Sequence, residues 1–345
     1  MKVLIVKMSS MGDIVHAQPV VADLLRRHPD VLIDWVAERA FAGIPAMNPG
    51  VRQVIPIAWR AWRRSLSKPD TRAALQAFVQ TLRRESYDHV IDCQGLIKSA
   101  VVSRIARAAQ RTGLSWDSAR EPWASLAYSR KAQVPWSLHV VARNRAVAGA
   151  ALGYTPEDPA RFGLQVPALV ADWLPVSSRP VALIPGASRP EKLWPEAHWV
   201  EVGRWLQTRG AQLIWLWGSP AERERVQRIA HACGGAVHDA SDSARPAPAP
   251  STLPASVLPP FLTVQAAAGL LASAVAVVGL DTGFTHLAGA LGRPTVGIFC
   301  DFDATQCAVS GDAPCESFGG IGQVPALSEI CAALARIAPC LGEAG

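Results

Sequence analysis

Short, uninterrupted runs of apolar residues alternate with helix-period segments along all 345 residues of the chain. A run without alternating polar residues is typical of a strand buried on both faces. Helices between successive strands make those strands parallel, because a parallel neighbour needs a long crossover connection. We expect strands at 2–7, 32–36, 89–92, 180–184, 212–217, 275–280 and 295–299, and helices at 18–27, 71–84, 195–209 and 221–232. The pattern predicts an α/β fold in which helices cover parallel sheets.

The alternation begins afresh near Arg179, after a proline-containing stretch at 166–180. Because one domain usually takes about 100–200 residues, we expect two Rossmann-like domains, at 1–170 and 178–325. A last helical segment at 328–337 has no strand after it, and we expect residues 326–345 to dock on the N-terminal domain. Residues 240–260 are rich in Pro, Ala and Ser, which predicts a flexible surface insertion.

The most hydrophobic stretch of the chain does not predict a membrane span. Residues 246–280 carry no charge and are long enough to cross a bilayer. Pro259-Pro260 interrupt that stretch, so we expect a short helix at 265–274 followed by a strand. At the N-terminus only four apolar residues separate Lys2 from Lys7, too few for a secretory signal.

The seven cysteines include no CxxC pair and are odd in number, so neither a disulfide framework nor a zinc site is indicated. Cys93 and Cys300 end apolar runs and are expected to be buried thiols. A reducing cytoplasm is the simplest compartment for such a set.

Charge is shared unequally between the two halves. Residues 1–175 hold 23 Lys and Arg against 14 Asp and Glu, a net +9, whereas residues 176–345 hold 11 against 14, a net −3. Arg60, Arg63 and Arg64 form a basic cluster. Trp59 and Trp62 are interleaved with these arginines in the sequence. The cluster is either a solvated basic loop or an anion-binding segment, since guanidinium groups match phosphate and carboxylate. Nucleic acid is not expected as a partner, because no DNA- or RNA-binding motif is present.

The turn after the first strand, SSMGDIVH, lacks both GxGxxG and GxxxxGK[ST], so neither dinucleotide nor P-loop binding is supported. Asp13 lies at the start of the following helix, at the carboxyl end of the strand, where open α/β sheets place their sites. Taken alone, Asp13 fits a helix cap at least as well. Lys7, at the end of the same strand, could keep Asp13 ionised or meet a substrate.

In the second half, the strand at 275–280 runs into Asp281, Thr282 and Gly283. Gly283 permits a tight turn from which the amides of the next helix point at an anion, which is the geometry of a diphosphate site. Asp281 cannot hold phosphate, so a sugar or ribose hydroxyl is its natural partner. His286, one turn into that helix, fits either the site or the core.

Two more strands of this half end in polar loops. Ser188 and Lys192 follow the strand at 180–184, where a lysine charge can meet phosphate. Glu222 follows the strand at 212–217 and could accept hydrogen bonds from ribose hydroxyls. Asp301-Phe302-Asp303 matches a metal-binding DxD in only three residues, and two solvated acids are the simpler interpretation.

Several long segments, in order, resemble the heptosyltransferase I branch of the lipopolysaccharide heptosyltransferases, glycosyltransferase family 9. They are KVLIVKMSSMGDIVHAQP, WRAWRRS, YDHVIDCQGLIKSA, DSAREPWASL, EKLWPEAHW and GLDTGFTHLAGALGRP. The resemblance covers nearly the whole chain. It implies a GT-B fold, two Rossmann-like domains facing across a cleft. The implied reaction is inverting and metal-independent, needs no cofactor, and transfers heptose from ADP-heptose to Kdo of Kdo₂-lipid A. It implies a cytoplasmic protein in peripheral contact with the inner membrane.

The resemblance also implies roles for individual residues. Asp13 matches the catalytic base. The donor-binding positions are Ser188, Lys192, Glu222, Leu262, Asp281, Thr282, Gly283 and His286. The acceptor-binding positions are Lys7, Arg60, Arg63, Arg64, Arg120 and Arg143. Ala187 replaces a common hydroxyl residue, the 240–260 insertion blurs the alignment of Leu262, and 300–304 lack the usual Gly-Pro-Thr-Asp-Pro, so no role passes to Asp301 or Asp303.

Two other functions stay open. A heptosyltransferase II or a later transferase of the family would use the same donor with a heptosylated acceptor. A non-catalytic protein could instead bind anionic glycolipid through the basic half. A nucleotide-dependent oxidoreductase fits less well, because the glycine fingerprint is absent.

Overall fold

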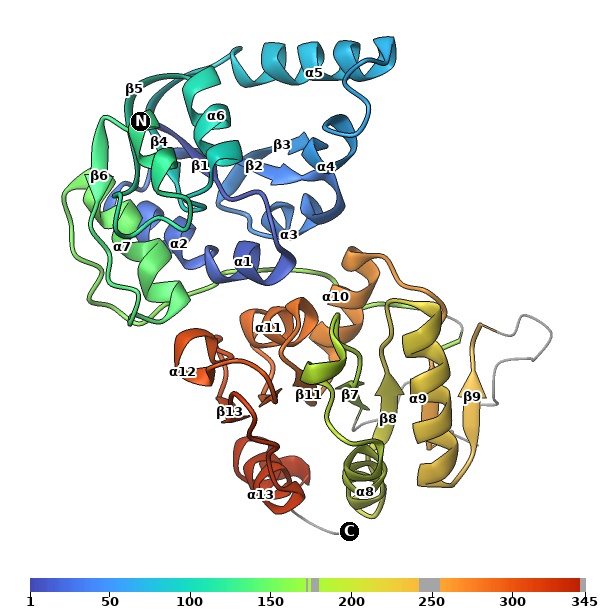
Figure 1. Cartoon of the computed structure of the whole chain (residues 1–345). Coiled ribbons are helices and arrows are strands. Elements are labelled where there is room, and N and C mark those ends of the chain that lie inside the picture. The colour runs from blue at the N-terminus through green and yellow to red at the C-terminus, as the bar shows by residue number, and fades with distance from the viewer. Residues whose placement is uncertain (172, 175–179, 242–254, 342–345) are drawn as a thin grey trace. The chain divides into compact units, whose positions relative to one another are not determined.

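The computed structural model describes residues 1–171, 173–174, 180–241 and 255–341. The chain divides into two compact units, Met1–Gln165 and Val166–Gly345 (Figure 1). The boundary falls a few residues before the expected end of the first domain at 170. Leu169 accounts for this, because its amide donates to the carbonyl of Gly269 in the second unit (3.1 Å).

The first unit is built on six parallel strands in the order β3-β2-β1-β4-β5-β6. The strands are β1 (Lys2–Val6), β2 (Leu32–Glu38), β3 (Val51–Ile57), β4 (Ser86–Asp92), β5 (Arg107–Leu114) and β6 (Arg130–Ala132). The central strand β1 is buried on both faces, and it pairs with β2 on one side and β4 on the other. The expected strands at 2–7, 32–36 and 89–92 are confirmed.

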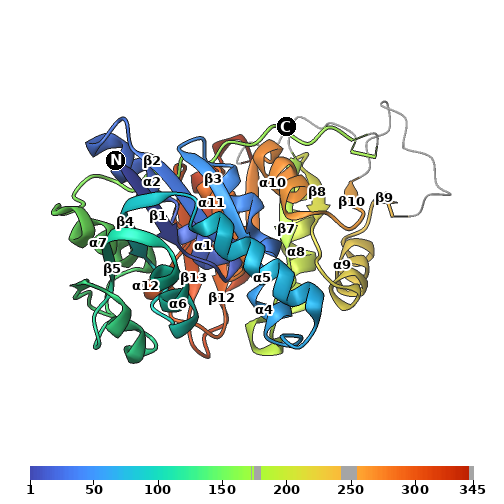
Figure 2. The same ribbon diagram turned by 90° about the horizontal axis from the view of Figure 1, so that it is seen from above.

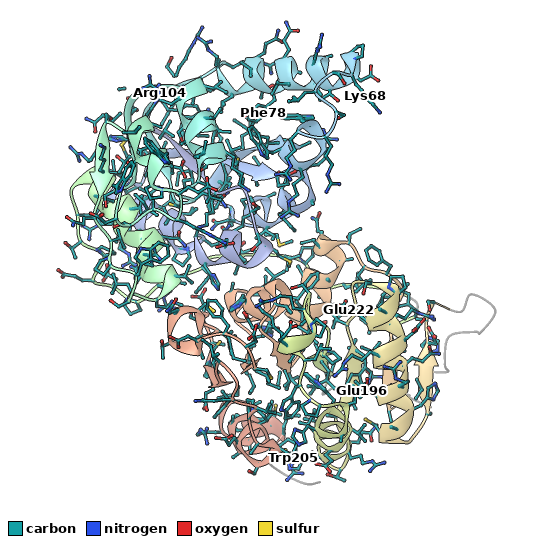
Figure 3. The ribbon with its side chains drawn as sticks, in the orientation of Figure 1. Lys68, Phe78, Arg104, Glu196, Trp205 and Glu222 are labelled. Carbon is teal, nitrogen blue, oxygen red and sulfur yellow. The ribbon has the colours of Figure 1, made fainter. Side chains whose placement is uncertain are left out.

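Helices cover both faces of this sheet. They are α1 (Met11–His16), α2 (Pro19–Arg27), α3 (Gly43–Ala46), α4 (Trp59–Trp62), α5 (Pro69–Leu82), α6 (Ile97–Ile105) and α7 (Val140–Leu152), with 3₁₀ turns η1 (Arg39–Phe41) and η2 (Pro122–Ala127). Figure 1 shows α5 and α6 on one face and α1, α2 and α7 on the other. Phe78 points from α5 toward the sheet (Figure 3) and meets the Trp62 ring edge-on at 5.6 Å.

The second unit contains seven parallel strands in the order β13-β12-β11-β7-β8-β10-β9. They are β7 (Pro180–Ile184), β8 (Gln212–Trp215), β9 (Val237–Asp239), β10 (Ser256–Leu258), β11 (Ala276–Leu280), β12 (Thr295–Phe299) and β13 (Cys315–Gly319). Strand β9 forms one edge of the sheet, beside α9 (Figure 2). The four strands expected in this half are confirmed.

The helices of the second unit are α8 (Glu196–Gln207), α9 (Pro220–Cys233), α10 (Val264–Ser273), α11 (Gly283–Ala290), α12 (Ala304–Cys307) and α13 (Leu327–Ile337), with 3₁₀ turns η3 (Pro190–Lys192) and η4 (Pro339–Leu341). One face of the sheet packs against α8, α9 and α13 around three buried tryptophans, Trp194, Trp199 and Trp215. Helix α11 lies on the other face with α10 beside it.

Two expectations about this unit were wrong. Helix α13 packs on α8 and β12 of its own unit, because Ile330, Leu334 and Ile337 on its apolar face complete that core. The segment 240–260 is not entirely an insertion, since β10 lies within it as a buried strand between β8 and β9. Residues 242–254 of that segment lie outside the described residues.

The uncharged stretch at 246–280 forms the expected short helix and strand, α10 and β11, in its described part. Among the described residues, no helix is both long enough and apolar enough to span a bilayer. The seven cysteines, all within the described residues, form no disulfide, and Cys93 and Cys300 are buried as expected. Burial raises the pKa of the Cys93 thiol to about 12.

Candidate active site

Each sheet has a central switch point, at which the crossovers from two neighbouring strands lead away in opposite directions. In the first unit this point lies between β1 and β4, and in the second between β7 and β11. Open α/β sheets bind ligands beyond the carboxyl ends of the strands at such a switch point. Asp13 follows β1, Lys192 follows β7 and Asp281 follows β11. These three strands flank the two switch points.

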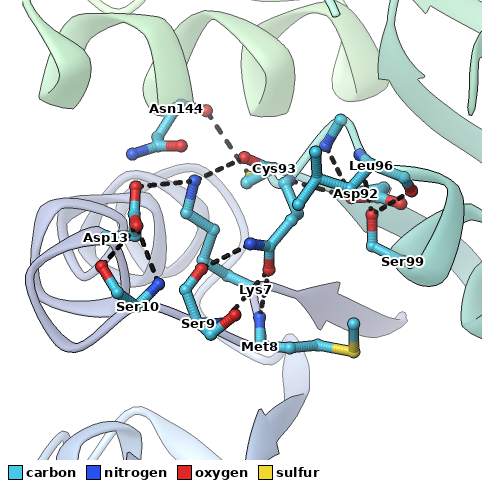
Figure 4. A network of polar contacts seen from close by, with 12 residues as sticks. Lys7, Met8, Ser9, Ser10, Asp13, Asp92, Cys93, Leu96, Ser99 and Asn144 are labelled. Carbon is cyan, nitrogen blue, oxygen red and sulfur yellow. Dashed lines mark hydrogen bonds and ion pairs between the residues drawn. The ribbon is translucent and has the colours of Figure 1, made fainter. Parts of the chain in front are cut away.

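Asp13 uses its two carboxylate oxygens differently (Figure 4). Its Oδ2 accepts hydrogen bonds from the backbone amide and the hydroxyl of Ser10, each at 2.7 Å. This is the reciprocal half of a capping box at the start of α1. Its Oδ1 lies 3.8 Å from the Lys7 ammonium, and the side chain is 40% exposed. Asp13 is therefore both a helix cap and an accessible, oriented carboxylate beside a positive charge.

Lys7 is fixed by its own contacts. Its side chain is 7% exposed, and its ammonium donates to the Cys93 carbonyl at 2.8 Å. The Trp35 indole donates to the Lys7 carbonyl at 3.0 Å. These contacts bury the Lys7 side chain and fix its ammonium 3.8 Å from Asp13 Oδ1.

Two residues that the sequence did not single out hold the loop between β1 and α1. The Gln94 side-chain oxygen accepts from the amides of Met8 (2.7 Å) and Ser9 (3.2 Å), and its nitrogen donates to the Ser9 carbonyl (Figure 4). Lys98 donates to the Ser9 hydroxyl at 2.9 Å. Both residues come from the segment after β4, so only the spatial neighbourhood of β1 and β4 reveals them.

The turn that carries Gln94 is organised by Asp92, which is fully buried. Its carboxylate accepts hydrogen bonds from the amide of Gln94 (2.9 Å), the hydroxyl of Tyr128 (2.8 Å) and the hydroxyl of Ser103 (3.2 Å). Burial raises the pKa of Asp92 above its ordinary value, while the Tyr128 hydroxyl and the Gln94 amide act in the opposite direction. The turn passes through Gly95 at φ +67°, a left-handed conformation that suits glycine.

The arginine cluster is exposed, whereas its neighbouring tryptophan is not. Arg60, Arg63 and Arg64 lie on the solvent side of α4 and the turn after it, and Trp62 is 7% exposed in the core. Arg52, which is close to the cluster in sequence, instead has a structural role. It donates two hydrogen bonds to the buried carboxylate of Asp34, at 2.9 and 2.7 Å.

Of the other two basic positions, Arg120 lies in the loop between β5 and η2, and Arg143 lies in the first turn of α7. Arg120 is exposed. Arg143 stacks on the Trp136 ring, with its guanidinium carbon 3.7 Å from the ring centroid, and donates to the Ser118 carbonyl at 3.1 Å. Arg143 is thus held in a defined orientation by an aromatic ring and a carbonyl.

In the second unit, Asp281 connects two of the predicted donor-binding residues. Its Oδ2 accepts from the Lys192 ammonium at 2.5 Å, and its Oδ1 lies 3.1 Å from Nε2 of His286. Burial alone would raise the pKa of Asp281, but His286 and Lys192 outweigh it and lower that pKa below its ordinary value. His286 is therefore buried and bonded to the site at the same time.

Asp281 precedes α11, whose first residues are Thr282 at the cap and Gly283. The first amides of a helix have no intrahelical partner and carry the positive end of the helix dipole, so this end favours an anion. Behind it, the Thr285 hydroxyl donates to the Leu280 carbonyl at 2.6 Å. A Cβ on Gly279 would lie 2.2 Å from that hydroxyl oxygen, so this close contact requires glycine.

Glu222 lies at the start of α9 (Figure 3). Its Oε2 accepts from the Gly218 amide at 2.7 Å, and its Cδ lies 2.6 Å from where a Cβ on Gly186 would be. Ser188 is exposed on the loop after β7, and Leu262 is partly exposed. Beside Leu262, Phe261 is 65% exposed with its ring 5.8 Å from that of Trp217, an aromatic pair that the sequence did not identify.

The two acids of the DxD-like segment have structural partners. Asp301 forms an ion pair with Arg189 at 2.9 Å, and Asp303 caps α12 through the Thr305 amide at 2.9 Å. Within the described ranges, no three His, Cys, Asp or Glu side chains are grouped as a metal site would need.

Two parallel-sheet α/β units define the class of protein, a GT-B glycosyltransferase with one Rossmann-like domain in each half. Residues 75–313 match the model of glycosyltransferase family 9 (heptosyltransferase). The chain belongs to that family.

Relatives and solved structures agree with this assignment. The lipopolysaccharide heptosyltransferase 1 of Pseudomonas aeruginosa is 37% identical over 324 residues, which cover 91% of this chain and 85% of that protein. The structure of the Escherichia coli heptosyltransferase WaaC with ADP superposes with a TM-score of 0.81 at 30% identity, over 98% of this chain and 100% of that one. WaaC with ADP-2-deoxy-2-fluoro heptose gives a TM-score of 0.77 at 32% identity, over 97% and 98%.

Proposed function

We propose that this chain transfers heptose from ADP-heptose to a Kdo residue of Kdo₂-lipid A. The observation that carries the proposal is the pair of polar clusters at the two switch points, Lys7–Asp13 in the first unit and Lys192–Asp281–His286 in the second. The solved relative that binds a fluorinated ADP-heptose supports the donor. The name of the Pseudomonas aeruginosa relative supports the acceptor.

In the proposed reaction, Asp13 is the general base. Its carboxylate takes the proton from the acceptor hydroxyl while that oxygen attacks the anomeric carbon of the heptose, and the bond from that carbon to ADP breaks. A single displacement of this kind inverts the anomeric configuration, as in inverting glycoside hydrolysis. The Lys7 ammonium, 3.8 Å from Asp13 Oδ1, holds a positive charge beside that carboxylate.

On the donor side, Lys192 and the amides that begin α11 at Thr282 and Gly283 stabilise the charge that grows on the departing ADP. Asp281 and His286 bind sugar hydroxyls, and the ion pair to Asp281 positions the Lys192 ammonium. Glu222 and Ser188 bind the ribose and phosphate, and Leu262 lies against adenine.

On the acceptor side, Arg60, Arg63, Arg64, Arg120 and Arg143 bind phosphates of lipid A and carboxylates of Kdo. Guanidinium groups match both anions with paired hydrogen bonds. The net charge of +9 over residues 1–175 is opposite in sign to the charge of this anionic acceptor.

The proposed reaction needs neither a metal nor a cofactor, because cationic side chains and helix amides balance the charge of the leaving group. Chelation of divalent ions with EDTA should leave the initial rate unchanged. The proposed location is the cytoplasmic face of the inner membrane, in peripheral contact with it, where a lipid-linked acceptor is within reach.

An ADP-release assay tests the proposal. Purified chain and ADP-heptose are mixed with Kdo₂-lipid A, with its monoheptosylated form, or with no acceptor. Stoichiometric ADP release with Kdo₂-lipid A alone supports the proposal. Release only with the heptosylated acceptor would identify a heptosyltransferase II. No release with either, despite acceptor binding, would identify a glycolipid-binding protein.

A further inference from the structure

Five large apolar side chains of the first unit are exposed to solvent on α6, on η2 and in the loop between β5 and η2. They are Ile97 (49% exposed), Val101 (41%), Trp116 (45%), Trp123 (65%) and Leu126 (65%). We refer to these five residues as the α6–η2 surface. The proposed reaction uses none of them.

The α6–η2 surface is continuous. Helix α6 packs directly against η2, and Ala100, Ala124 and Tyr128 fill the space between them. The rings of Trp116 and Trp123 meet edge-on with centroids 5.0 Å apart. The two elements and the tryptophan pair therefore present their exposed side chains together.

Helical geometry explains why these residues are exposed as a set. Ile97 and Val101 are four residues apart and share one face of α6, while Ala100 and Val102 on the other side are buried. Trp123 and Leu126 are three residues apart in a 3₁₀ helix, where such side chains eclipse one another. An ordinary surface helix would place polar residues at these outward positions.

Basic residues outnumber acids in the segment that carries the surface. Over residues 97–145 there are nine Lys and Arg against two acids. Arg104 is exposed on α6 three residues after Val101, and exposed Arg120 lies between the two tryptophans in the chain, whereas Lys98 is bonded to Ser9 (Figure 3 labels Arg104). Both acids are near: Asp117 is exposed, and Glu121 accepts from the Ile97 amide at 2.6 Å. The net charge of the segment is positive.

We propose that the α6–η2 surface docks on an anionic lipid bilayer, with Trp116, Trp123 and Leu126 entering the interfacial layer. Tryptophan is preferred at that layer because its ring is apolar and its indole N–H is polar. Apolar side chains rimmed by Lys and Arg are the usual features of proteins that lie on such a surface. A contiguous apolar patch of this kind marks an interaction site.

This docking deepens the proposed function, on which it rests for the lipid-linked acceptor. Arg120, proposed to bind that acceptor, is four residues from Trp116 and three from Trp123. A bilayer held at the α6–η2 surface would leave the acyl chains of the acceptor in the membrane while its charged sugars reach the arginines.

Vesicle co-sedimentation tests the proposal with the full chain. Vesicles of phosphatidylethanolamine and phosphatidylglycerol should bind it, and vesicles of phosphatidylcholine should bind it at least about tenfold more weakly. Trp123→Gln/Leu126→Gln should lower binding to the anionic vesicles by about tenfold or more. The matched control is Ile321→Gln/Val324→Gln, since these side chains are 71% and 54% exposed in the second unit. That variant should bind like the unmodified chain.

A second readout begins with the unmodified chain and uses only conservative substitutions. Brominated lipids should quench part of the tryptophan fluorescence of the unmodified chain, and Trp116→Phe/Trp123→Phe should remove that part. Equal vesicle binding by Trp123→Gln/Leu126→Gln and the unmodified chain would overturn the proposal. So would a lipid-free dimer, seen by analytical ultracentrifugation, that this variant dissociates.

The transferase proposal is tested separately. With a deacylated, water-soluble acceptor, Trp123→Gln/Leu126→Gln should release ADP at the same rate as the unmodified chain. Loss of ADP release in both chains with intact vesicle binding would refute the transferase but not the docking surface. Normal ADP release by both chains, together with vesicle binding by Trp123→Gln/Leu126→Gln equal to that of the unmodified chain, would refute the docking surface but not the transferase.

Discussion

Replacing Asp13 by Asn should separate its two roles. The amide oxygen of Asn can still accept the Ser10 amide, which Asp13 Oδ2 accepts at 2.7 Å, so α1 keeps its cap. The variant loses the charge that faces Lys7 at 3.8 Å. Because that carboxylate is 40% exposed, the pair contributes only about 0–1 kcal/mol to the free energy of unfolding.

The effect on catalysis should be far larger. An amide cannot take a proton from the acceptor hydroxyl, so kcat should fall by about 10²–10⁴-fold. The Tm should change by no more than about 2–4 °C, the shift that 1 kcal/mol produces in a chain of this size class. ADP-heptose affinity, measured by calorimetry, should be unchanged because the residues proposed to bind the donor lie in the other unit.

Two further variants sharpen the test. Asp13→Ala should lower kcat as much as Asp13→Asn does in this prediction. It should also lower the free energy of unfolding by about 1 kcal/mol, since nothing replaces the capping oxygen. Ser10→Ala removes the 2.7 Å hydroxyl contact but keeps the carboxylate, so it should lose much less kcat than Asp13→Asn. Turnover of Asp13→Asn within tenfold of the unmodified chain would remove Asp13 from the mechanism.

Three other predictions concern the remaining parts of the site. The pKa of Asp281 is lowered in the folded chain, so its ion pair stabilises the fold above about pH 4, near the unfolded value, and this contribution is lost as pH falls through the folded pKa. The Tm difference between the unmodified chain and Asp281→Asn should therefore shrink below about pH 4 in a pH series of thermal melts. Gly186→Ala places a Cβ 2.6 Å from Glu222 Cδ and should displace that flexible side chain, so this variant and Glu222→Gln should both raise KM for ADP-heptose; an unchanged donor KM would refute the proposed ribose contact. Replacing Arg60, Arg63 and Arg64 by Gln should raise acceptor KM and weaken its salt dependence, whereas a raised donor KM would contradict the division of roles.

The sequence predicted the central strands of both sheets well, because those strands are apolar along their whole length. β1, β7 and β12 are buried on every or almost every residue, and each begins where predicted. Strands near the edges were missed. β5 reads RAAQRTGL and exposes Arg107 and Gln110, so its residues resemble a polar loop until their partner strand is known.

The candidate site was predictable where a strand leads directly into a polar loop, as for Asp13, Lys192 and Asp281. It was not predictable where the contact comes from another strand. Gln94 meets Ser9 across 85 residues of sequence, and Lys98 does so across 89. Such contacts depend on which strands are neighbours, and composition carries no information on that order. Composition also does not distinguish Arg52, which is paired with buried Asp34, from the exposed arginines nearby.

The start of α1 has a consequence for binding stoichiometry. In a dinucleotide-binding Rossmann domain, the helix after the first strand turns its amides toward a pyrophosphate. Here the chain fills that position with its own anion, since Asp13 accepts the Ser10 amide and faces Lys7. A nucleotide phosphate approaching the same place would meet a carboxylate. The two halves share one architecture but are not equivalent as receptors, so titration with ADP should saturate at one molecule per chain.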